Sequence, residues 1–521
     1  MRTSHIVVSI FLIFFLSLFV FQKINLTTAD LGRHIENGEL LVHADSVGIA
    51  REALLHTNFF SYTNPDFPFV NHHWGSGILL YVCYYLIGFG GLSLLYGGSL
   101  ILAVLVLFYP FREKIPLWIS GPIILFLIPL IAERTEVRPE GFSYLLLAII
   151  TALLYAYTTD SLQRKWLWAI PVIALFFVNM HIYFIFVPFI IGMFLLEALL
   201  RGDFGKSKWL GIILGISSFV LLVNPYGLGG VLYPFTIFNN YGYLVVENQS
   251  IKFLENYGLL NPNFLWWKVS TFFLAIGTIG TIWKYRKNIV KKFPTALVGV
   301  SITFAILSFL GIRHFTMYGL TLVPLFLTYA EILYKKPEDQ NKTENHIVAS
   351  FGICILLVIM IFIHFSSRLP WSSKWGFGLE PEINASAEFF KKENIKGPVF
   401  SNYDIGGYLI FHLYPNEKVF ADNRPEAYPA AFFENEYKKM QLDDAAWKEE
   451  LKKWNFNAIY FYYRDLTPWA QKFLITRISD PTWAPVYVDN YTLIFLRRNE
   501  QNENTIKKYE LPKNIFNTTQ P

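Results

Sequence analysis

Charged residues are scarce in this chain: Asp, Glu, Lys and Arg make up 16% of its 521 residues, whereas hydrophobic residues make up 53%. Together with a mean hydropathy of +0.36, this composition excludes a disordered chain or an ordinary soluble protein, and it indicates a membrane protein with several spans. There are only two cysteines, Cys83 and Cys354, both in apolar segments. We therefore expect neither a disulfide framework nor a thiolate metal site. The net charge of +5 is small and its basic residues lie in short loops, so we expect no nucleic-acid partner.

What the chain has in abundance is long apolar runs. About eleven of them approach the ~20 residues that cross a bilayer core, which predicts an α-helical polytopic membrane protein. The first run lacks a strongly basic leader and a small-residue cleavage site, so we expect a retained anchor and not a signal peptide. The runs are Ile6–Phe21, Leu92–Tyr109, Leu117–Ala132, Phe142–Tyr157, Leu167–Val178, Tyr183–Leu200, Leu210–Val223, Val269–Trp283, Ala296–Leu310, Thr316–Leu333 and Val348–Phe365.

The topology depends on a shorter apolar segment, Trp74–Ile87. If it does not cross the bilayer, the basic loops all fall on the cytoplasmic side, in agreement with the positive-inside rule. We therefore predict an in-plane or re-entrant helix in the first external loop, with the N-terminus cytoplasmic and the C-terminus external. The basic loops are Arg112/Lys114, Arg164/Lys165, Arg201/Lys206/Lys208, Lys284–Lys292 and Lys335/Lys336.

The composition changes near residue 367 to that of a soluble domain. We predict a transmembrane domain over 1–366 with a first external loop over 22–91, an external α/β domain over 367–498, and a loose polar tail over 499–521. Within the α/β domain we expect helices at Ala385–Glu393 and Ile405–Leu413, and strands at Pro398–Ser401, Lys418–Ala421, Ala458–Tyr463 and within Pro485–Leu496.

Polar side chains with chemical potential gather in the first external loop. Asp30 follows the first apolar run directly, and a carboxylate at a membrane surface can act as a general base or orient a metal ion. If this segment is helical, His34 and Asn37 share its face with Asp30. The alternative is a solvated loop helix that Asp30 caps. His72 and His73 indicate either metal binding or, as we favour, hydrogen bonding at the bilayer interface.

Arginines lie at two span ends on the predicted external face. Arg134 and Arg138 lie in the mixed-charge loop 133–140, and Arg313 and His314 separate two apolar runs. The fork of an arginine matches phosphate oxygens, so a donor phosphate is one partner for these groups. The alternatives are a loop neutralised by its own ion pairs and an arginine that reaches the lipid headgroups.

Two further polar positions lie in predicted external loops. Asn179-Met180-His181 interrupts an apolar run, as a tight turn or as part of a cavity lining. Glu247 lies in the loop 224–266, the longest one of the second half, which is free to approach the first loop.

The arrangement of these residues resembles the GT-C superfamily of membrane glycosyltransferases. That resemblance consists of an Asp after the first span, a long first external loop with an in-plane helix, and a terminal external domain. The likeness is greatest to uncharacterised bacterial members with the pattern Asp-x-Gly-x-His…Gly, Ser-Tyr-Thr and Asn-His-x-Trp. Here these are Asp30/Gly32/His34/Gly38, Ser61–Thr63 and Asn71/His72/Trp74, joined by Arg138-Pro139-Glu140, Asn179/His181, Asn224–Gly227 and Arg313.

A more distant likeness is to the catalytic subunit of oligosaccharyltransferase. The stretch 401–408 and the following Asp422-Asn423 look like that enzyme's Trp-Trp-Asp-x-Gly segment and the Asp-Asn beyond it. Asp404 and Gly406 match, whereas Asn402 and Tyr403 stand where that enzyme has the tryptophans that help to hold its acceptor peptide. The loop around Glu247 looks like the loop that clamps substrate there.

The resemblance implies an inverting transfer of a sugar from a polyprenyl-phosphate donor to a glycan, lipid or protein acceptor. It implies a multi-pass protein of the bacterial plasma membrane that acts on the external face, and a divalent metal ion is an open alternative. A flippase for lipid-linked sugars and a non-catalytic assembly protein are the competing functions. The resemblance implies that Asp30 is the base and that the donor phosphate is held by Arg134, Arg138, Arg313 and His314. The metal candidates are Asp30, Glu136 and Glu247. The implied substrate loops contain His34, Asn37, His72, His73, His181, Glu247, Asn402, Asp404 and Gly406.

Overall fold

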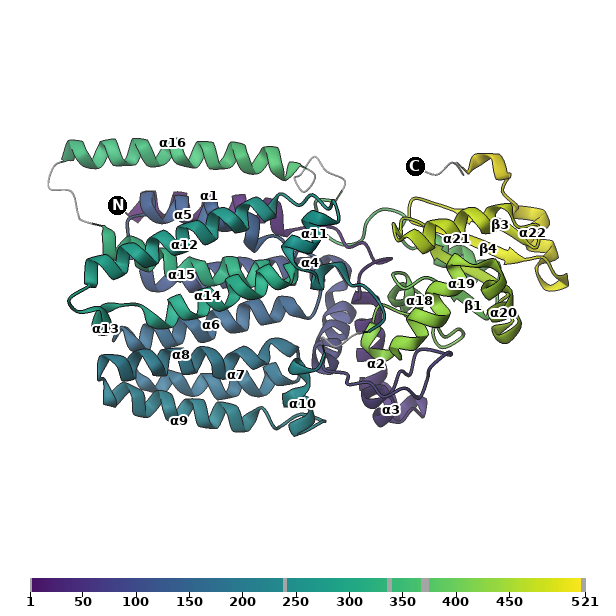
Figure 1. Cartoon of the computed structure of the whole chain (residues 1–521), viewed down its shortest axis with the longest axis horizontal. Coiled ribbons are helices and arrows are strands. Elements are labelled where there is room, and N and C mark those ends of the chain that lie inside the picture. Colours follow the sequence, from purple (N-terminus) through teal and green to yellow (C-terminus); the bar gives the residue numbers. More distant parts are fainter. Residues whose placement is uncertain (1, 238–240, 335–339, 367–373, 517–521) are drawn as a thin grey trace. The chain divides into compact units, whose positions relative to one another are not determined.

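The computed structural model describes residues 2–237, 241–334, 340–366 and 374–516, and most of them are helical (Figure 1). The chain divides into two compact units, which we describe separately. The membrane unit comprises Met1–Lys23, Gly90–Val231 and Val245–Gly378, and the sheet unit comprises Ile24–Phe89, Leu232–Leu244 and Leu379–Pro521.

The membrane unit is a bundle of helices. Each of the eleven apolar runs falls almost wholly within a helical segment, because a backbone in lipid must satisfy its hydrogen bonds internally. The long helices run roughly parallel to one another (Figure 1). They are α1 (Arg2–Val20), α5 (Leu117–Ile131), α6 (Glu140–Thr158), α7 (Ala169–Val178), α8 (Phe186–Arg201), α9 (Phe204–Val220), α12 (Asn263–Tyr285), α14 (Thr295–Leu310), α15 (Phe315–Leu333) and α16 (Gln340–His364), with the shorter α10 (Leu228–Leu232), α11 (Ile251–Asn256) and α13 (Ile289–Lys292) between them.

Six helices in the described residues are long and apolar enough to cross a membrane. Three shorter apolar helices, within α1, α5 and α14, accompany them. The protein is therefore a membrane protein, and the total of about eleven spans stays a prediction. Helix α15 is the most buried of the six and packs on α5 and α14. It approaches α5 closely at Gly319, where an added side chain would come within 3.0 Å of Leu130 and Ile131.

Helix α4 (Trp74–Phe108) joins two segments that the sequence predicted to be separate. The helix is broken at Gly88, whose backbone angles (φ 64°, ψ −172°) are costly for any residue with a side chain. Trp74–Ile87 is thus a helix in its own right, as expected. Its in-plane orientation stays a prediction.

The sheet unit contains one four-stranded sheet with the order β1-β2-β4-β3. The pair β1–β2 is parallel, and β2–β4 and β4–β3 are antiparallel. The strands are β1 (Val399–Ser401), β2 (Ala458–Tyr462), β3 (Trp483–Val488) and β4 (Thr492–Arg497), and the helices are α2 (Leu31–Val47), α3 (Arg51–His56), α17 (Ala385–Lys392), α18 (Gly406–Leu413), α19 (Lys438–Leu442), α20 (Asp444–Trp454), α21 (Pro468–Ser479) and α22 (Glu503–Tyr509).

Two expectations for this unit are wrong. Lys418–Ala421 is not a strand of the sheet, because its backbone pairs with the first loop: Val419 N–H donates to Phe60 (3.1 Å), and Tyr62 N–H donates to Val419 (3.1 Å). The tail from Asn499 is not loose over its described part. It contains α22, and the amide of Asn502 donates to the carbonyl of Arg497 (2.8 Å).

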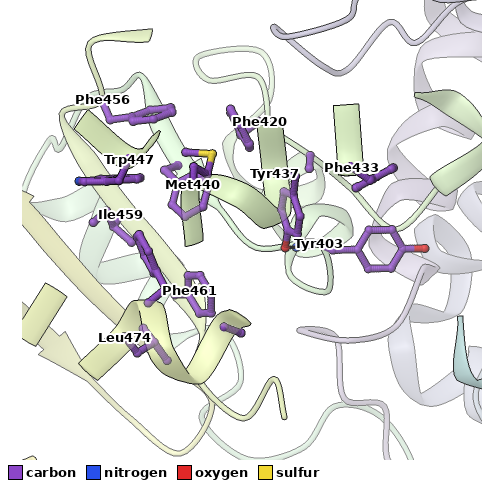
Figure 2. Packing of buried hydrophobic residues seen from close by; sticks show 14 of the residues in the cluster. Tyr403, Phe420, Phe433, Tyr437, Met440, Trp447, Phe456, Ile459, Phe461 and Leu474 are labelled. Carbon is purple, nitrogen blue, oxygen red and sulfur yellow. Dashed lines mark hydrogen bonds between the residues drawn. The ribbon is translucent and has the colours of Figure 1, made fainter. Parts of the chain in front are cut away.

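Aromatic packing fills the core of the sheet unit. Trp447 stacks on Phe456 at 5.4 Å between ring centroids, and Phe420 meets Phe456 edge-on at 5.5 Å (Figure 2). Such ring pairs add to the stabilisation that burial of their large apolar area already provides. The core therefore fixes the loop after Phe420, which contains polar residues of the candidate site.

Three segments distant in the sequence build this one unit. Tyr62 of the first loop donates to the carbonyl of Val399 (2.9 Å), and Thr63 donates to that of Phe420 (2.9 Å). From the segment 232–244, the ring of Tyr243 stacks on Tyr403 at 4.1 Å. The predicted topology puts all three segments on the external side, and their contacts within one unit agree with it.

The predicted topology can be tested by labelling single cysteines with a membrane-impermeant maleimide after Cys83 and Cys354 are replaced by serine. Lys287 and Glu449 are both exposed. We expect Glu449→Cys to be labelled in sealed spheroplasts and Lys287→Cys only after permeabilisation, because the positive-inside rule places the basic loop 284–292 in the cytoplasm. The reverse pattern would invert the topology.

Candidate active site

Glycines set the position of Asp30, the residue before helix α2. A side chain on Gly32 would come within 2.8 Å of the carbonyl oxygen of Gly407 at the start of α18. One on Gly406 would come within 2.3 Å of Asp422 Cα. The starts of α2 and α18 and the loop after Phe420 therefore pack with their backbones nearly in contact, which only glycine permits.

This packing brings Asp30 to Asn423. The side-chain amide of Asn423 donates a hydrogen bond to the Asp30 carboxylate. Within the described residues the Asp30 side chain makes no capping hydrogen bond to α2. Its carboxylate is thus held by a neighbouring loop, and it is positioned independently of the helix that follows it.

A buried ion pair lies beside this contact. Asp422 is fully buried and accepts hydrogen bonds from Nε (2.8 Å) and Nη2 (2.6 Å) of Arg424. Burial raises the pKa of Asp422, but Arg424 outweighs it and holds this pKa below its usual value. Arg424 also donates to Asn58 (2.8 Å), and Tyr428 donates to Asp422 (3.1 Å). These hydrogen bonds hold the backbone on either side of Asn423.

The helix predicted at Asp30–Gly38 is present, but its polar face is not solvated. His34 is buried with its edge on the ring of His73 (5.2 Å), and the side-chain oxygen Oδ1 of Asn37 accepts a hydrogen bond from the side-chain amide of Asn71 (2.9 Å). His72 lies 3.8 Å from His73 between ring centroids. In the described residues no group of three or more His, Cys, Asp or Glu side chains is placed to hold a metal ion.

The segment 402–404 divides into a structural and a reactive position. Asn402 accepts from Tyr462 N–H (2.9 Å) and donates to Asp465 (3.1 Å), so its amide joins two loops of the unit. Asp404 has a different environment. Burial, reinforced by the charges of Asp465 and Asp30, raises its pKa to about 7, so this carboxyl can exchange a proton near neutral pH.

The arginines predicted to bind phosphate do cluster, in the membrane unit. Arg134 donates from Nε to Glu140 (2.7 Å) and from Nη1 to Glu247 (2.6 Å). Arg138 donates to Glu136 (2.9 Å), and its Nη1 lies 3.4 Å from the same Glu247 oxygen. Glu136 and Glu140 therefore neutralise part of the positive charge of the 133–140 loop, as one alternative predicted. Glu247, from a distant segment, supplies further negative charge.

A short 3₁₀ turn, η5 (Val246–Asn248), brings Glu247 to this cluster. The next residue, Asn248, accepts a hydrogen bond from Nη1 of Arg313 (2.9 Å). Burial raises the pKa of Glu247, but the charges of Arg134, Arg138 and Arg313 overcome this and hold the pKa well below its usual value. Glu247 and Glu136 are both bonded to arginine, so neither is a ready metal ligand.

Histidines line the same region. His314 is buried, and its Nδ1 lies 2.8 Å from the hydroxyl of Tyr183, with the two rings stacked. Nδ1 of His181 lies 2.8 Å from the hydroxyl of Ser143. Both histidines are therefore fixed by tyrosine or serine side chains of neighbouring helical segments.

Sequence reasoning missed several members of both clusters. Asn423 and Glu140 stand inside segments that the resemblance singled out, and a charged or amide side chain in such a segment is the signal that could have found them. Tyr183 and Tyr144 lie in apolar runs that carry no such signal. The clusters lie in separate units: Asp30 belongs to the sheet unit and the arginines to the membrane unit.

Comparison with known proteins rests on structure alone. No family model and no curated protein matches the chain. Among solved structures, the oligosaccharyltransferase AglB of Archaeoglobus fulgidus matches in three states at 12% identity. These are the complex with an inhibitory peptide and a dolichol-phosphate (TM-score 0.57; 96% of this chain, 74% of that one), the apo form (0.58; 95% and 74%) and the complex with Zn and sulfate (0.59; 95% and 73%).

The chain has the fold of archaeal oligosaccharyltransferase AglB. This match confirms, for the fold, the predicted likeness to GT-C glycosyltransferases and to the catalytic subunit of oligosaccharyltransferase. A mostly helical membrane protein with a small C-terminal sheet also agrees with the predicted fold class.

The ion pair beside Asp30 gives a stability prediction. Asp422→Asn leaves the guanidinium of Arg424 buried without its counter-charge, which we expect to cost roughly 3–5 kcal/mol in the free energy of unfolding. The control is Asp45→Asn. The Asp45–Arg51 pair is exposed and should cost less than about 1 kcal/mol. Thermal unfolding of the full-length protein in detergent compares them, and equal shifts would contradict the argument.

Asp404 predicts a pH dependence. Its folded pKa of about 7 lies above its ordinary value, so the folded chain binds a proton that the unfolded chain releases. That contribution to stability is present in acid and is lost as the pH rises to about 7. Asp404→Asn has no ionisable carboxyl at this position, so it does not lose stability in this way. We therefore expect the difference in melting temperature, variant minus wild type, to be more positive at pH 8 than at pH 5. Glu449→Gln, an exposed carboxylate, is the control, and a pH-independent difference for Asp404→Asn would refute the assignment.

Proposed function

We propose that this protein transfers a sugar from a polyprenyl-phosphate donor to an acceptor, with inversion at the anomeric carbon. The observation that carries the proposal is Asp30, held by Asn423 in a chain with the AglB fold. The AglB structures were solved with a dolichol-phosphate and with an acceptor peptide. In such a transfer a polyprenyl phosphate is the group that leaves the sugar, and the acceptor is the group that receives it. We place the reaction on the external face of the bacterial plasma membrane.

In this mechanism Asp30 is the general base. It accepts a proton from the acceptor nucleophile as that atom bonds to the anomeric carbon. The bond from this carbon to the phosphate oxygen breaks, and its electron pair stays on the phosphate. Attack opposite the leaving group inverts the configuration. The hydrogen bond from Asn423 keeps the carboxylate in one orientation for this proton transfer.

The arginine cluster is assigned to the donor phosphate. Negative charge grows on this group as the bond to the sugar breaks, and preorganised donors lower the barrier by stabilising it. Arg134, Arg138 and Arg313 offer guanidinium forks that match phosphate oxygens. His314, fixed by Tyr183, is a further hydrogen-bonding group at the same place.

The acceptor side is assigned to the loop around Asp404. Its position next to Gly406 places it at the start of α18, which packs on α2 just beyond Asp30. Whether the acceptor is a glycan, a lipid or a protein stays open. His34, Asn37, His72 and Asn402 are assigned to the support of the sheet unit, because each makes a hydrogen bond there. His73, which packs on His34 and His72, is assigned to the same role.

Loss of the base should block transfer but leave the protein folded. In cells that lack the gene and express a variant, we expect Asp30→Asn to accumulate the polyprenyl-phosphate sugar that wild type consumes, with transfer reduced roughly 100-fold or more. Asp45→Asn, an exposed carboxylate of the same helix, is the matched control. Lipid and glycan profiling by mass spectrometry measures both.

The same experiment separates the competing functions. A flippase or an assembly protein has no need of a base at position 30, so full complementation by Asp30→Asn would refute the transfer mechanism. Accumulation with Asp30→Asn but not with Asp45→Asn would support it.

A further inference from the structure

The η5 turn covers the whole arginine cluster. The Oε2 atom of Glu247 accepts a hydrogen bond from Arg134 (2.6 Å) and lies 3.4 Å from Nη1 of Arg138. Its neighbour Asn248 accepts from Arg313 (2.9 Å). The adjacent side chains of Glu247 and Asn248 thus accept hydrogen bonds from all three arginines.

These donors are the ones that a phosphate would need. A carboxylate and a phosphate present oxygens of similar spacing to a guanidinium fork, and both form charge-assisted hydrogen bonds with it. One N–H group cannot donate at full strength to two anions. Glu247 and a bound phosphate would therefore compete for Nη1 of Arg134 and of Arg138.

We propose that Glu247 is an internal substitute for the donor phosphate. The η5 turn closes the arginine cluster when no donor is present, and the anionic phosphodiester of the donor displaces the Glu247 carboxylate. This inference rests on the proposed function, and it assigns to Glu247 a regulatory role at the donor site in place of a direct role in holding substrate or metal.

The charge of the cluster agrees with such an exchange. The three arginines are balanced by three glutamates, Glu136, Glu140 and Glu247. With Glu247 withdrawn, three positive and two negative charges leave a net charge of +1. A sugar linked to a lipid through one phosphate is a phosphodiester with a single negative charge, so the exchange restores neutrality in a partly buried site.

Of the two carboxylates bonded to Arg134, Glu247 is the better placed to leave. The side chain of Glu140 is 4% exposed and belongs to the first turn of α6, whereas that of Glu247 is 20% exposed on a three-residue turn. The turn has local backbone bonds, from Asn248 N–H to Val245 and from Gln249 N–H to Val246 (3.1 Å each). Few local bonds make a segment easy to open.

Two buried hydrogen-bond donors of the cluster could bond to an anion larger than the Glu247 carboxylate. In the described residues, Nη2 of Arg134 and the hydroxyl of Tyr144 are buried without a hydrogen-bond partner. Buried donors without a partner are uncommon and costly. A tetrahedral phosphate has more oxygens than the single Glu247 atom that now meets the arginines, so it could accept from these groups as well.

The test is the binding of farnesyl phosphate, a short polyprenyl phosphate, to the full-length protein in nanodiscs. We expect Glu247→Gln to bind it about tenfold more tightly than wild type, which is about 1.4 kcal/mol, because the competing carboxylate is gone. Glu136→Gln is the matched control. It removes the same charge from an exposed group that forms an ion pair with Arg138, and we expect less than a twofold change.

Inorganic phosphate and farnesol are the comparison probes. Tighter binding of both phosphates, but not of farnesol, by Glu247→Gln supports an anion site for the headgroup. Unchanged or weaker phosphate binding by Glu247→Gln overturns the inference, and so does an equal gain for Glu136→Gln, which would reflect net charge alone. If neither phosphate binds to wild type or variant, the donor site of the proposed function fails too. If phosphate binds but Glu247→Gln does not improve it, only the role of Glu247 fails.

Discussion

The pairing of buried guanidinium groups with carboxylates is the constraint on which both polar clusters depend. A buried charge is tolerated only where an opposite charge and further hydrogen bonds replace its lost hydration. In the sheet unit, Arg424 meets Asp422 with two hydrogen bonds. In the membrane unit, Arg134 meets Glu140 and Glu247. Arg134 also bonds Glu247 and Arg424 also bonds Asn58, both far away in the sequence, so the contacts of these guanidinium groups also hold the local fold.

The two clusters neutralise their buried guanidinium groups in different ways, and the difference matters for the functions proposed for them. Asp422 and Arg424 lie two residues apart in one loop and close on each other, with further hydrogen bonds from Tyr428 and to Asn58. That network is rigid and suits the support of Asp30. The arginines of the membrane unit share carboxylates that come from a helix start and from a short turn. A shared, partly exposed partner can be exchanged for a ligand, whereas a bidentate buried one cannot without a large cost.

Sequence patterns predicted those features that depend on local order. Each apolar run is helical, and β1, β2 and α18 lie where alternation and turns placed them, because burial periodicity is a local property. Lys418–Ala421 has strand composition, yet it pairs with the first loop at Phe60 and Tyr62. The first loop, which is hundreds of residues away in the sequence, takes up the backbone hydrogen bonds that this segment would otherwise make to the sheet. The tail after Asn499 looked loose because its polar composition conceals the hydrogen bonds of Asn502.

The candidate site follows the same division. Asp30, Arg134, Arg138 and Arg313 could be found from their type and their position at span ends. Asn423 and Tyr183 could not be assigned, since the contact of Asn423 with Asp30 spans 393 positions in the sequence. Glu247 was found as a candidate, but its pairing with Arg134 and Arg138 was not predicted. A carboxylate in an external loop is compatible with a metal, a substrate or an arginine, and only the fold decides among them.

In the resemblance to oligosaccharyltransferase, Asn402 and Tyr403 stand where that enzyme has two tryptophans, and both side chains have partners within this protein's own fold. The amide of Asn402 is consumed by Tyr462 and Asp465. The ring of Tyr403 is covered by Tyr243, and its N–H donates to the hydroxyl of Tyr437. Side chains committed to their own fold are not available to hold a peptide. If the protein transfers a sugar as proposed, its acceptor must be recognised by other groups, and Asp404, whose carboxyl has its pKa raised to about 7 by burial, is one candidate.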